Sequence, residues 1–280
     1  MRLTPGEGGL QRLLLTAADG ARAEIYQHGA HVASWIPAGG SEQLYLSRKA
    51  QFKSGAAIRG GIPVIFPQFA GEGPLPKHGF ARGLPWRLIA ATQPGQGPAT
   101  AVFGLDDDDT TRAIWPHSFK AESRVTLGGA ALETMLSVEN TGESEISFTA
   151  ALHTYLRVAE VGAVRLHGLQ GLHYRDTAQG GVAAVESAEQ LRIEGEVDRI
   201  YFNAPARLEL SGAPGRLHIE SAGFPDAVVW NPGAERGAAL SDLDQEGYRN
   251  FLCVEAAVVG VPVKLAPGAR WSGTQRLLQD

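Results

Sequence analysis

Residues 58–86, IRGGIPVIFPQFAGEGPLPKHGFARGLPW, combine basic groups with an unusual density of chain-breaking residues. They include three cations (Arg59, Lys77 and Arg82), one histidine (His78), six glycines and five prolines. This composition excludes a long helix, because proline removes a backbone donor and glycine loses much entropy when it is ordered. The short apolar run 62–66 therefore predicts a strand-like piece between two loops that each carry basic side chains.

These basic loops suit an anionic ligand. A guanidinium can donate to two oxygens of an oxyanion at once, and binding residues concentrate on loops held by a rigid scaffold. The alternative is a solvated basic loop, since charged side chains are mostly exposed. The neighbouring prolines favour the binding site, because they reduce the entropy that is lost when the loops become ordered.

Composition and charge exclude several classes of protein. The chain has 280 residues, 44% hydrophobic and 20% charged, which is an ordinary globular balance. A formal charge of −5 argues against a nucleic-acid partner. The one cysteine cannot form an intramolecular disulfide, and neither a secretory segment nor about 18 consecutive apolar residues occur. We therefore expect a cytoplasmic monomer that binds neither nucleic acid nor membranes.

Alternating apolar and polar residues recur along most of the chain. This pattern, punctuated by glycine- and proline-rich turns, predicts a single domain over residues 1–280 with an all-β fold, a large antiparallel β-sandwich with few short helices. Helical patterns occur only at 186–193 and 234–243. The acidic run 106–109 is interpreted as a solvated loop, because adjacent acids lack the spacing of a calcium loop. The expected strands are an 11–25 hairpin turning at 18–20, then 31–35, 42–46, 86–91, 101–105 (after a loop at 93–98), 119–127, 132–140, 146–158, 164–168, 206–210, 217–221, 227–230, 251–259, 263–265 and 271–278.

Two residues are unusual within these strands. Alternation in 148–158, FTAALHTYLRV, places His153 on the same face as Tyr155 and Arg157. In 251–263, FLCVEAAVVGVPV, Glu255 lies within an otherwise apolar run. A buried carboxylate must pair with a cation, take a proton or open into a cleft. A core histidine and a structural salt bridge are the alternatives; together, however, the two side chains could serve as acid and base.

Other candidates are weaker. Asp198 could accept hydrogen bonds from a polyol, but its position before an apolar strand favours a turn. The remaining histidines lack the spacing of zinc ligands, so no metal site is assigned. No phosphate-binding or nucleophile motif is found, and Cys253, in an apolar strand without an adjacent cation, is interpreted as inert.

Taken in order, several segments resemble the aldose 1-epimerase superfamily and, within it, the hexose-6-phosphate mutarotases, also called glucose-6-phosphate 1-epimerases. Any one segment is weak evidence, but the set is specific and spans most of the chain. The segments are 58-IRGGIPVIFPQF-69, 77-KHGFAR-82, 115-WPHSF-119, 151-ALHTYLRV-158, 198-DRIY-201, 229-VWNP-232 and 253-CVEAA-257.

The resemblance implies a galactose mutarotase-like sandwich with the sugar in a cleft. It also implies interconversion of the α and β anomers of a hexose 6-phosphate, without cofactor or metal. The family's catalytic residues match His153 and Glu255. Its sugar- and phosphate-contacting positions match Arg59, Lys77, Arg82 and Asp198, with His78 beside them in the same motif.

The chain departs from the family pattern at Lys77, where glutamine is common. Lysine keeps a donor and adds a charge, which would strengthen a preference for phosphate; a side chain pointing to solvent is the alternative. Two other functions stay open. One is an epimerase for unphosphorylated aldoses, which would not need the cations. The other is a non-catalytic carbohydrate-binding module, which would have no use for a glutamate in an apolar strand.

Overall fold

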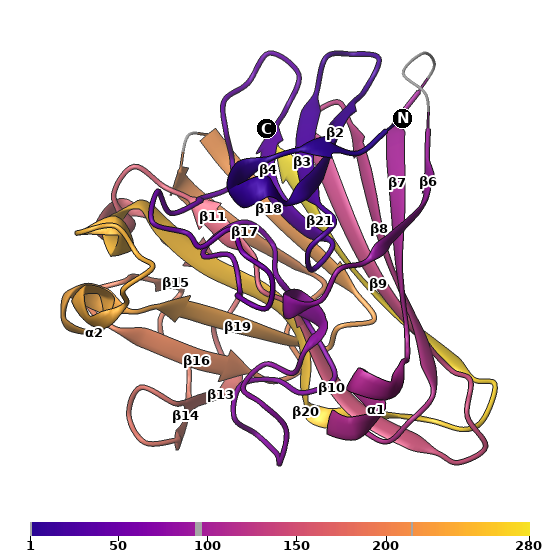
Figure 1. The fold of residues 1–280 in the computed structure, drawn as a ribbon. Helices are drawn as coiled ribbons and strands as arrows, with labels where there is room; N and C mark the ends of the chain where they lie inside the picture. Colours follow the sequence, from indigo (N-terminus) through magenta and orange to yellow (C-terminus); the bar gives the residue numbers. More distant parts are fainter. Residues whose placement is uncertain (1, 93–96, 214) are drawn as a thin grey trace.

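A computed structural model describes residues 2–92, 97–213 and 215–280. Within these ranges, the strands form three antiparallel sheets of four, eight and nine strands (Figure 1). The prediction of an all-β, antiparallel architecture is therefore confirmed. Residues 93–96 of the expected loop 93–98 lie outside the described ranges.

The four-stranded sheet contains the expected hairpin near the N-terminus. In spatial order its strands are β1 (Thr4–Pro5), β2 (Gln11–Thr16), β3 (Arg22–Tyr26) and β4 (His31–Ile36).

The eight-stranded sheet carries the stretch 58–86 at one edge. In spatial order it contains β14 (Val182–Val185), β13 (His173–Asp176), β16 (Val197–Tyr201), β19 (Asp226–Asn231), β20 (Phe251–Leu265), β10 (Ile146–Leu152) and β5 (Val64–Ile65), with β11 (Tyr155–Arg157) also paired to β20.

The nine-stranded sheet packs against the other two. Its order is β15 (Gln190–Leu191), β12 (Arg165–His167), β17 (Arg207–Ala213), β18 (Gly215–Ala222), β21 (Arg270–Gln279), β9 (Ala131–Asn140), β8 (Phe119–Gly128), β7 (Ala99–Asp106) and β6 (Arg87–Ala91). The helices of the described chain are α1 (Asp109–Ile114), α2 (Gly233–Ala239) and the 3₁₀ turns Glu7–Gly9, Ala81–Gly83, Val161–Ala163 and Gly247–Asn250.

One apolar cluster extends from Leu13 to Leu277 and draws side chains from all three sheets. The long strand β20 contributes Leu252, Val254 and Ala256 to this cluster. Because strand side chains alternate between faces, the intervening residues of β20 point to the opposite side of the sheet. Glu255 therefore points away from the main core.

The predicted strand 42–46 is wrong. Only isolated bridges occur here, from Leu44 to Leu156 and from Leu46 to Gly60. The Glu42 carboxylate explains this, because Oε1 accepts hydrogen bonds from the backbone N–H groups of Trp35 and Leu44, both 2.9 Å. A side chain thus takes the donors that a regular ladder would use.

The predicted helix 186–193 is also wrong, and part of this segment forms β15. Glu186 is buried, where its Oε2 accepts from Arg199 Nη1 at 3.1 Å and from the Tyr201 hydroxyl at 2.9 Å. This charge-assisted anchoring fixes the chain in an extended path. The helical pattern at 234–243 is confirmed by α2.

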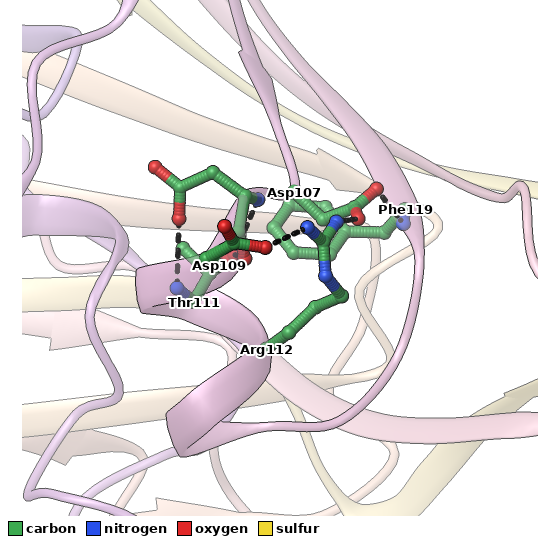
Figure 2. A network of polar contacts seen from close by, with 6 residues as sticks. Asp107, Asp109, Thr111, Arg112 and Phe119 are labelled. Atoms are coloured by element: carbon green, nitrogen blue, oxygen red, sulfur yellow. Dashed lines mark hydrogen bonds and ion pairs between the residues drawn. The ribbon is translucent and has the colours of Figure 1, made fainter.

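The acidic run 106–109 connects the end of β7 to the start of α1, a helix that the sequence pattern did not predict (Figure 2). Asp106, Asp108 and Asp109 are exposed, as expected for a solvated run. Asp108 forms the N-cap, with its Oδ1 accepting from the Thr111 backbone N–H at 2.8 Å, and the Asp108 backbone N–H donates to the Thr111 hydroxyl at 2.8 Å. Arg112 pairs with Asp107 and Asp109. Acids at a helix N-terminus also interact favourably with the positive end of the helix dipole.

Candidate active site

A cavity of about 520 Å³ opens on the face of the eight-stranded sheet that bears Glu255. Its volume lies within the range of small-molecule sites. Seven sequence-predicted site residues, brought together from five separate segments, line it: Arg59, Lys77, His78, Arg82, His153, Asp198 and Glu255.

Strand register brings His153 and Glu255 together. Leu152 of β10 pairs with Ala256 of β20, and Tyr155 of β11 pairs with Cys253. Between these pairs the ladder opens, and His153 lies opposite Glu255 with Nδ1 3.3 Å from Oε1. The expected strand 146–158 is therefore interrupted at residues 153 and 154. The interruption frees the histidine to reach the cavity.

Burial changes the proton affinity of both groups. His153 and Glu255 are 7% and 2% exposed. Desolvation, followed by repulsion from His78, lowers the pKa of His153 well below its ordinary value. Desolvation and repulsion from Asp198 raise the pKa of Glu255 well above its ordinary value. Burial therefore favours neutral His153 beside protonated Glu255, a pair that holds one proton.

Aromatic side chains hold the histidine ring. Tyr155 stacks on His153 with the ring centroids 4.8 Å apart and the planes 8° apart. Trp230 meets the same ring edge-on at 5.7 Å and lines the cavity. Trp35 and Trp86, by contrast, are fully buried in the core. Phe80 lies in that core as well.

Arg59 is already paired within the protein. Its Nε and Nη2 form a bidentate contact with Asp242, both distances 3.2 Å, and its Nη1 donates to the Tyr155 hydroxyl at 3.0 Å. Tyr155 and Asp242 raise the pKa of Arg59, so the guanidinium stays charged. Gly60 shapes this turn, because its φ is 116° and a Cβ there would lie 2.3 Å from the Tyr45 carbonyl oxygen.

Lys77 and Arg82 lack an ion-pair partner among the described residues. The Arg82 guanidinium donates to the Lys77 carbonyl oxygen at 3.3 Å. Desolvation lowers the pKa of both groups. Repulsion from Arg236 and Arg82 adds to the shift of Lys77, and repulsion from Arg59 adds to that of Arg82. The intervening Gly79 has φ 65°, and a Cβ there would lie 2.2 Å from the Phe66 carbonyl oxygen. Two cations that face one cavity without an ion-pair contact among the described residues favour a bound anion.

His78 is a neutral group in this cavity. Its Nδ1 accepts a hydrogen bond from the Ala70 N–H at 3.3 Å, and its ring meets Phe69 edge-on. Desolvation, with repulsion from Arg82 and Lys77, lowers the pKa of His78 to about 3. With Nδ1 accepting, Nε2 carries the proton, so His78 can donate a hydrogen bond without adding charge.

Asp198 is a strand residue rather than a turn residue. It lies in β16 opposite Trp230 of β19 and faces the cavity. Desolvation raises its pKa, while Thr177, Arg236 and Lys77 oppose the shift. The apolar strand expected directly after Asp198 is β16, which already begins at Val197 and so includes Asp198. In this position the carboxylate can accept hydrogen bonds from sugar hydroxyls.

Sequence reasoning missed other contributors to the site. Arg236 of α2 lines the cavity and pairs with Glu196 at 2.6 Å. Thr177 lines it too, and Asp242 holds Arg59 from outside. Each comes from a segment without an unusual pattern, and Arg59 and Asp242 are separated by 183 positions. Only the folded chain shows these partnerships.

The fold of the chain is a galactose mutarotase-like β-sandwich. The crystal structure of a putative mutarotase from Salmonella typhimurium superposes on it with a TM-score of 0.88. That likeness covers 100% of this chain and 97% of the other, at 27% sequence identity.

The family is shown by sequence. The family described as Aldose 1-epimerase matches residues 11–278. A Cenchrus ciliaris protein named "Putative glucose-6-phosphate 1-epimerase" is 38% identical over 274 residues, 95% of this chain and 83% of its own. An Escherichia coli K12 protein of the same name is 35% identical over 241 residues, 84% and 79% of the two chains. The chain therefore belongs to the aldose 1-epimerase family, a family of isomerases. In the described part of the chain, no helix is long and apolar enough to cross a membrane.

Proposed function

We propose that this protein interconverts the α and β anomers of a hexose 6-phosphate, with glucose 6-phosphate as the first substrate to test. The observation that carries the proposal is the His153–Glu255 pair, 3.3 Å apart, in a cavity that also presents the unpaired cations Lys77 and Arg82. Relatives named for glucose-6-phosphate 1-epimerase activity support the same substrate class. The whole chain acts as one domain, and the reaction needs no cofactor.

Ring opening requires two proton transfers. Glu255, as carboxylate, takes the proton of the C1 hydroxyl, while protonated His153 donates to the ring oxygen and the C1–O5 bond breaks. The aldehyde then rotates about C1–C2. In ring closure, Glu255 returns its proton to the carbonyl oxygen, and His153 takes the proton of the C5 hydroxyl. Atoms and charges balance, and the pair is restored.

Burial favours the protonation state that the His153–Glu255 pair has when the sugar is in its open-chain form. In that state Glu255 is protonated and His153 is neutral, so the desolvated pair carries no charge. The pKa directions of the two groups agree with this state. Opening the ring thus converts a buried ion pair into two neutral groups, which offsets part of the cost of breaking the C1–O5 bond.

The cations of the cavity account for the phosphate. Lys77 and Arg82 can donate charge-assisted hydrogen bonds to a phosphate dianion, and Arg236, whose charge acts on Lys77, adds positive potential. Asp198 and neutral His78 are placed to hydrogen-bond the sugar hydroxyls. Arg59, held by Asp242 and Tyr155, contributes a fixed charge near the catalytic pair.

The deciding experiment is anomer exchange measured by NMR on equilibrated glucose 6-phosphate, with glucose as the parallel substrate. We expect faster exchange for the phosphate. Glu255→Gln keeps the shape of the side chain but removes the base, so kcat should fall by about 10²- to 10⁴-fold while substrate binding persists. Equal acceleration for glucose would favour an epimerase of free aldoses. No acceleration for either sugar would favour a binding module.

A further inference from the structure

One side chain beside the catalytic pair has no part in the proposed reaction. Cys253 lies two residues before Glu255 on the same face of β20, and it is fully buried. His153 Nδ1 or Nε2, Cys253 Sγ and a Glu255 carboxylate oxygen lie within 4.8 Å of one another. These three side chains, called the HCE cluster below, form the one such group of potential metal ligands in the described chain.

We propose that the HCE cluster binds a zinc-class divalent cation, which inhibits the enzyme by occupying the catalytic pair. Imidazole nitrogen, thiolate sulfur and carboxylate oxygen are the ligand types that Zn²⁺ takes in proteins. A sugar phosphate and the metal would then compete for His153 and Glu255. The inhibitory part of the inference rests on the proposed function, whereas metal binding itself does not.

Unsatisfied polar atoms support a ligand at this place. His153 Nδ1 and Glu255 Oε2 are buried and have no hydrogen-bond partner. Buried polar atoms without partners are rare and costly, and their presence at one point is an argument for a bound group. Glu255 offers its second oxygen to a metal even when Oε1 stays near the histidine.

The geometry requires only a small adjustment. Two ligand atoms of a tetrahedral zinc lie roughly 3.6 Å apart, given metal–ligand distances of about 2.0–2.3 Å. His153 and Glu255 already approach to 3.3 Å, and the widest separation in the HCE cluster would shrink by roughly 1 Å. Because His153 and Glu255 line the cavity, the metal has an entry path, and water can supply the fourth ligand.

Charge balance also permits the site, although cations surround it. Arg59, Lys77, Arg82 and Arg236 face the same cavity and would repel an uncompensated dication. Metal ligands must be deprotonated, however. Binding of Zn²⁺ would displace two protons, one from the Cys253 thiol and one from the His153–Glu255 pair. The two protons together carry the same charge as the Zn²⁺ ion that replaces them. The net charge of the cavity is unchanged.

The test measures metal binding apart from activity. Purified protein without substrate is titrated with Co²⁺, which gives a near-ultraviolet charge-transfer band when a thiolate binds it. We expect the band in the wild type and its loss in Cys253→Ala and in the near-isosteric Cys253→Ser. His173→Ala removes an exposed histidine and should keep the band. No band in the wild type, or a band that survives both cysteine substitutions, would overturn the site.

Inhibition is measured next on glucose 6-phosphate in phosphate-free buffer. Cys253 is outside the proposed acid–base machinery, so Cys253→Ser should keep the basal rate. We expect zinc to slow the wild type reversibly, with activity restored by EDTA, and Cys253→Ser to need at least about 10- to 100-fold more zinc. Equal zinc sensitivity of the two proteins would refute the inhibitory role. A cobalt band in a protein without mutarotase activity would support the site and contradict the proposed function.

Discussion

At the scale of single residues, the site depends on one proton shared by two buried side chains. His153 Nδ1 and Glu255 Oε1 are held 3.3 Å apart and away from solvent. Burial there disfavours both the charged imidazolium and the charged carboxylate. Such a pair titrates as a unit, so its pH behaviour differs from that of either isolated group.

The pH profile of kcat should show this coupling. Because burial lowers the pKa of His153, a second proton enters the pair only well below pH 6.5. Because burial raises the pKa of Glu255, the single proton leaves only well above pH 4.5. We therefore expect the acid limb of the kcat profile to lie below the range where free imidazole titrates. The rate is measured as kcat, since the second ionisation of the phosphate near pH 6 affects binding. A midpoint at the ordinary histidine value would contradict this shared-proton interpretation.

Arg59 and Arg82 should differ although both face the cavity. Arg82 has no carboxylate partner, so Arg82→Ala should raise KM for glucose 6-phosphate by about 10- to 100-fold, the loss of charge-assisted hydrogen bonds. The same substitution should raise KM for glucose by less than about threefold. Arg59→Ala should in addition lower the free energy of unfolding by about 1–3 kcal/mol, because half-buried Asp242 loses its partner.

Substrate kinetics and urea denaturation of both variants distinguish these effects. Asp242→Asn serves as the matched control, since it breaks the same pair from the other side. If Arg82→Ala weakened both sugars equally, its role would be structural. If Arg59→Ala left stability unchanged, the Asp242 pair would be dispensable.

The candidate residues could be found from the sequence because they were out of place in their local patterns. A glutamate within an apolar strand and cations among prolines can be recognised without a fold. Their partners could not be recognised: Asp242, Tyr155 and Arg236 are ordinary in their segments. What makes them functional is proximity across 96 to 183 positions of chain.

At the scale of elements, alternation predicted the long strands well and failed where side chains replace backbone hydrogen bonds. β8, β9 and β21 match their predicted ranges closely, because each buries every second residue. The strand predicted at 42–46 is wrong, and the helix α1 was not predicted, for one shared reason. In both, a carboxylate accepts from backbone N–H groups, a contact that depends on local geometry rather than on hydrophobic period.

The cap of α1 gives a test confined to one element. Asp108→Ala removes the acceptor of the Thr111 N–H group, and loss of an N-cap costs about 0.5–2 kcal/mol. We expect chemical denaturation to show a loss of that size. Because α1 does not line the cavity, kcat and KM should not change.

Asp109→Ala is the matched control for that substitution. Asp109 is the neighbouring acid but does not cap the helix, and its contact is an exposed ion pair with Arg112. Asp109→Ala should therefore lower the free energy of unfolding by less than about 1 kcal/mol. Equal losses for the two variants would assign the effect to the charge of the acidic run rather than to the cap.

At the scale of the whole molecule, the net charge is negative, whereas several cations line the cavity. The chain carries a formal net charge of −5, yet its cavity presents Arg59, Lys77, Arg82 and Arg236. The net charge repels a dianionic substrate at long range, while the local cations attract it near the cavity. Since the Debye length is about 10 Å at 0.1 M ionic strength, the nearby cations dominate under ordinary conditions.

Ionic strength should therefore change the kinetics selectively. Raising salt from about 0.05 M to 0.5 M should lower kcat/KM for glucose 6-phosphate several-fold through KM, leave kcat level and hardly affect glucose. Lys77→Gln removes the exposed cation at the cavity rim and keeps a hydrogen-bond donor, so it should flatten the salt dependence with little effect on the free energy of unfolding. The comparison of the two proteins on both sugars separates local attraction from a general effect of salt on the enzyme. A salt dependence that is the same for Lys77→Gln and the wild type would mean that Lys77 does not attract the phosphate, and the anion site would then depend on Arg82 with Arg59.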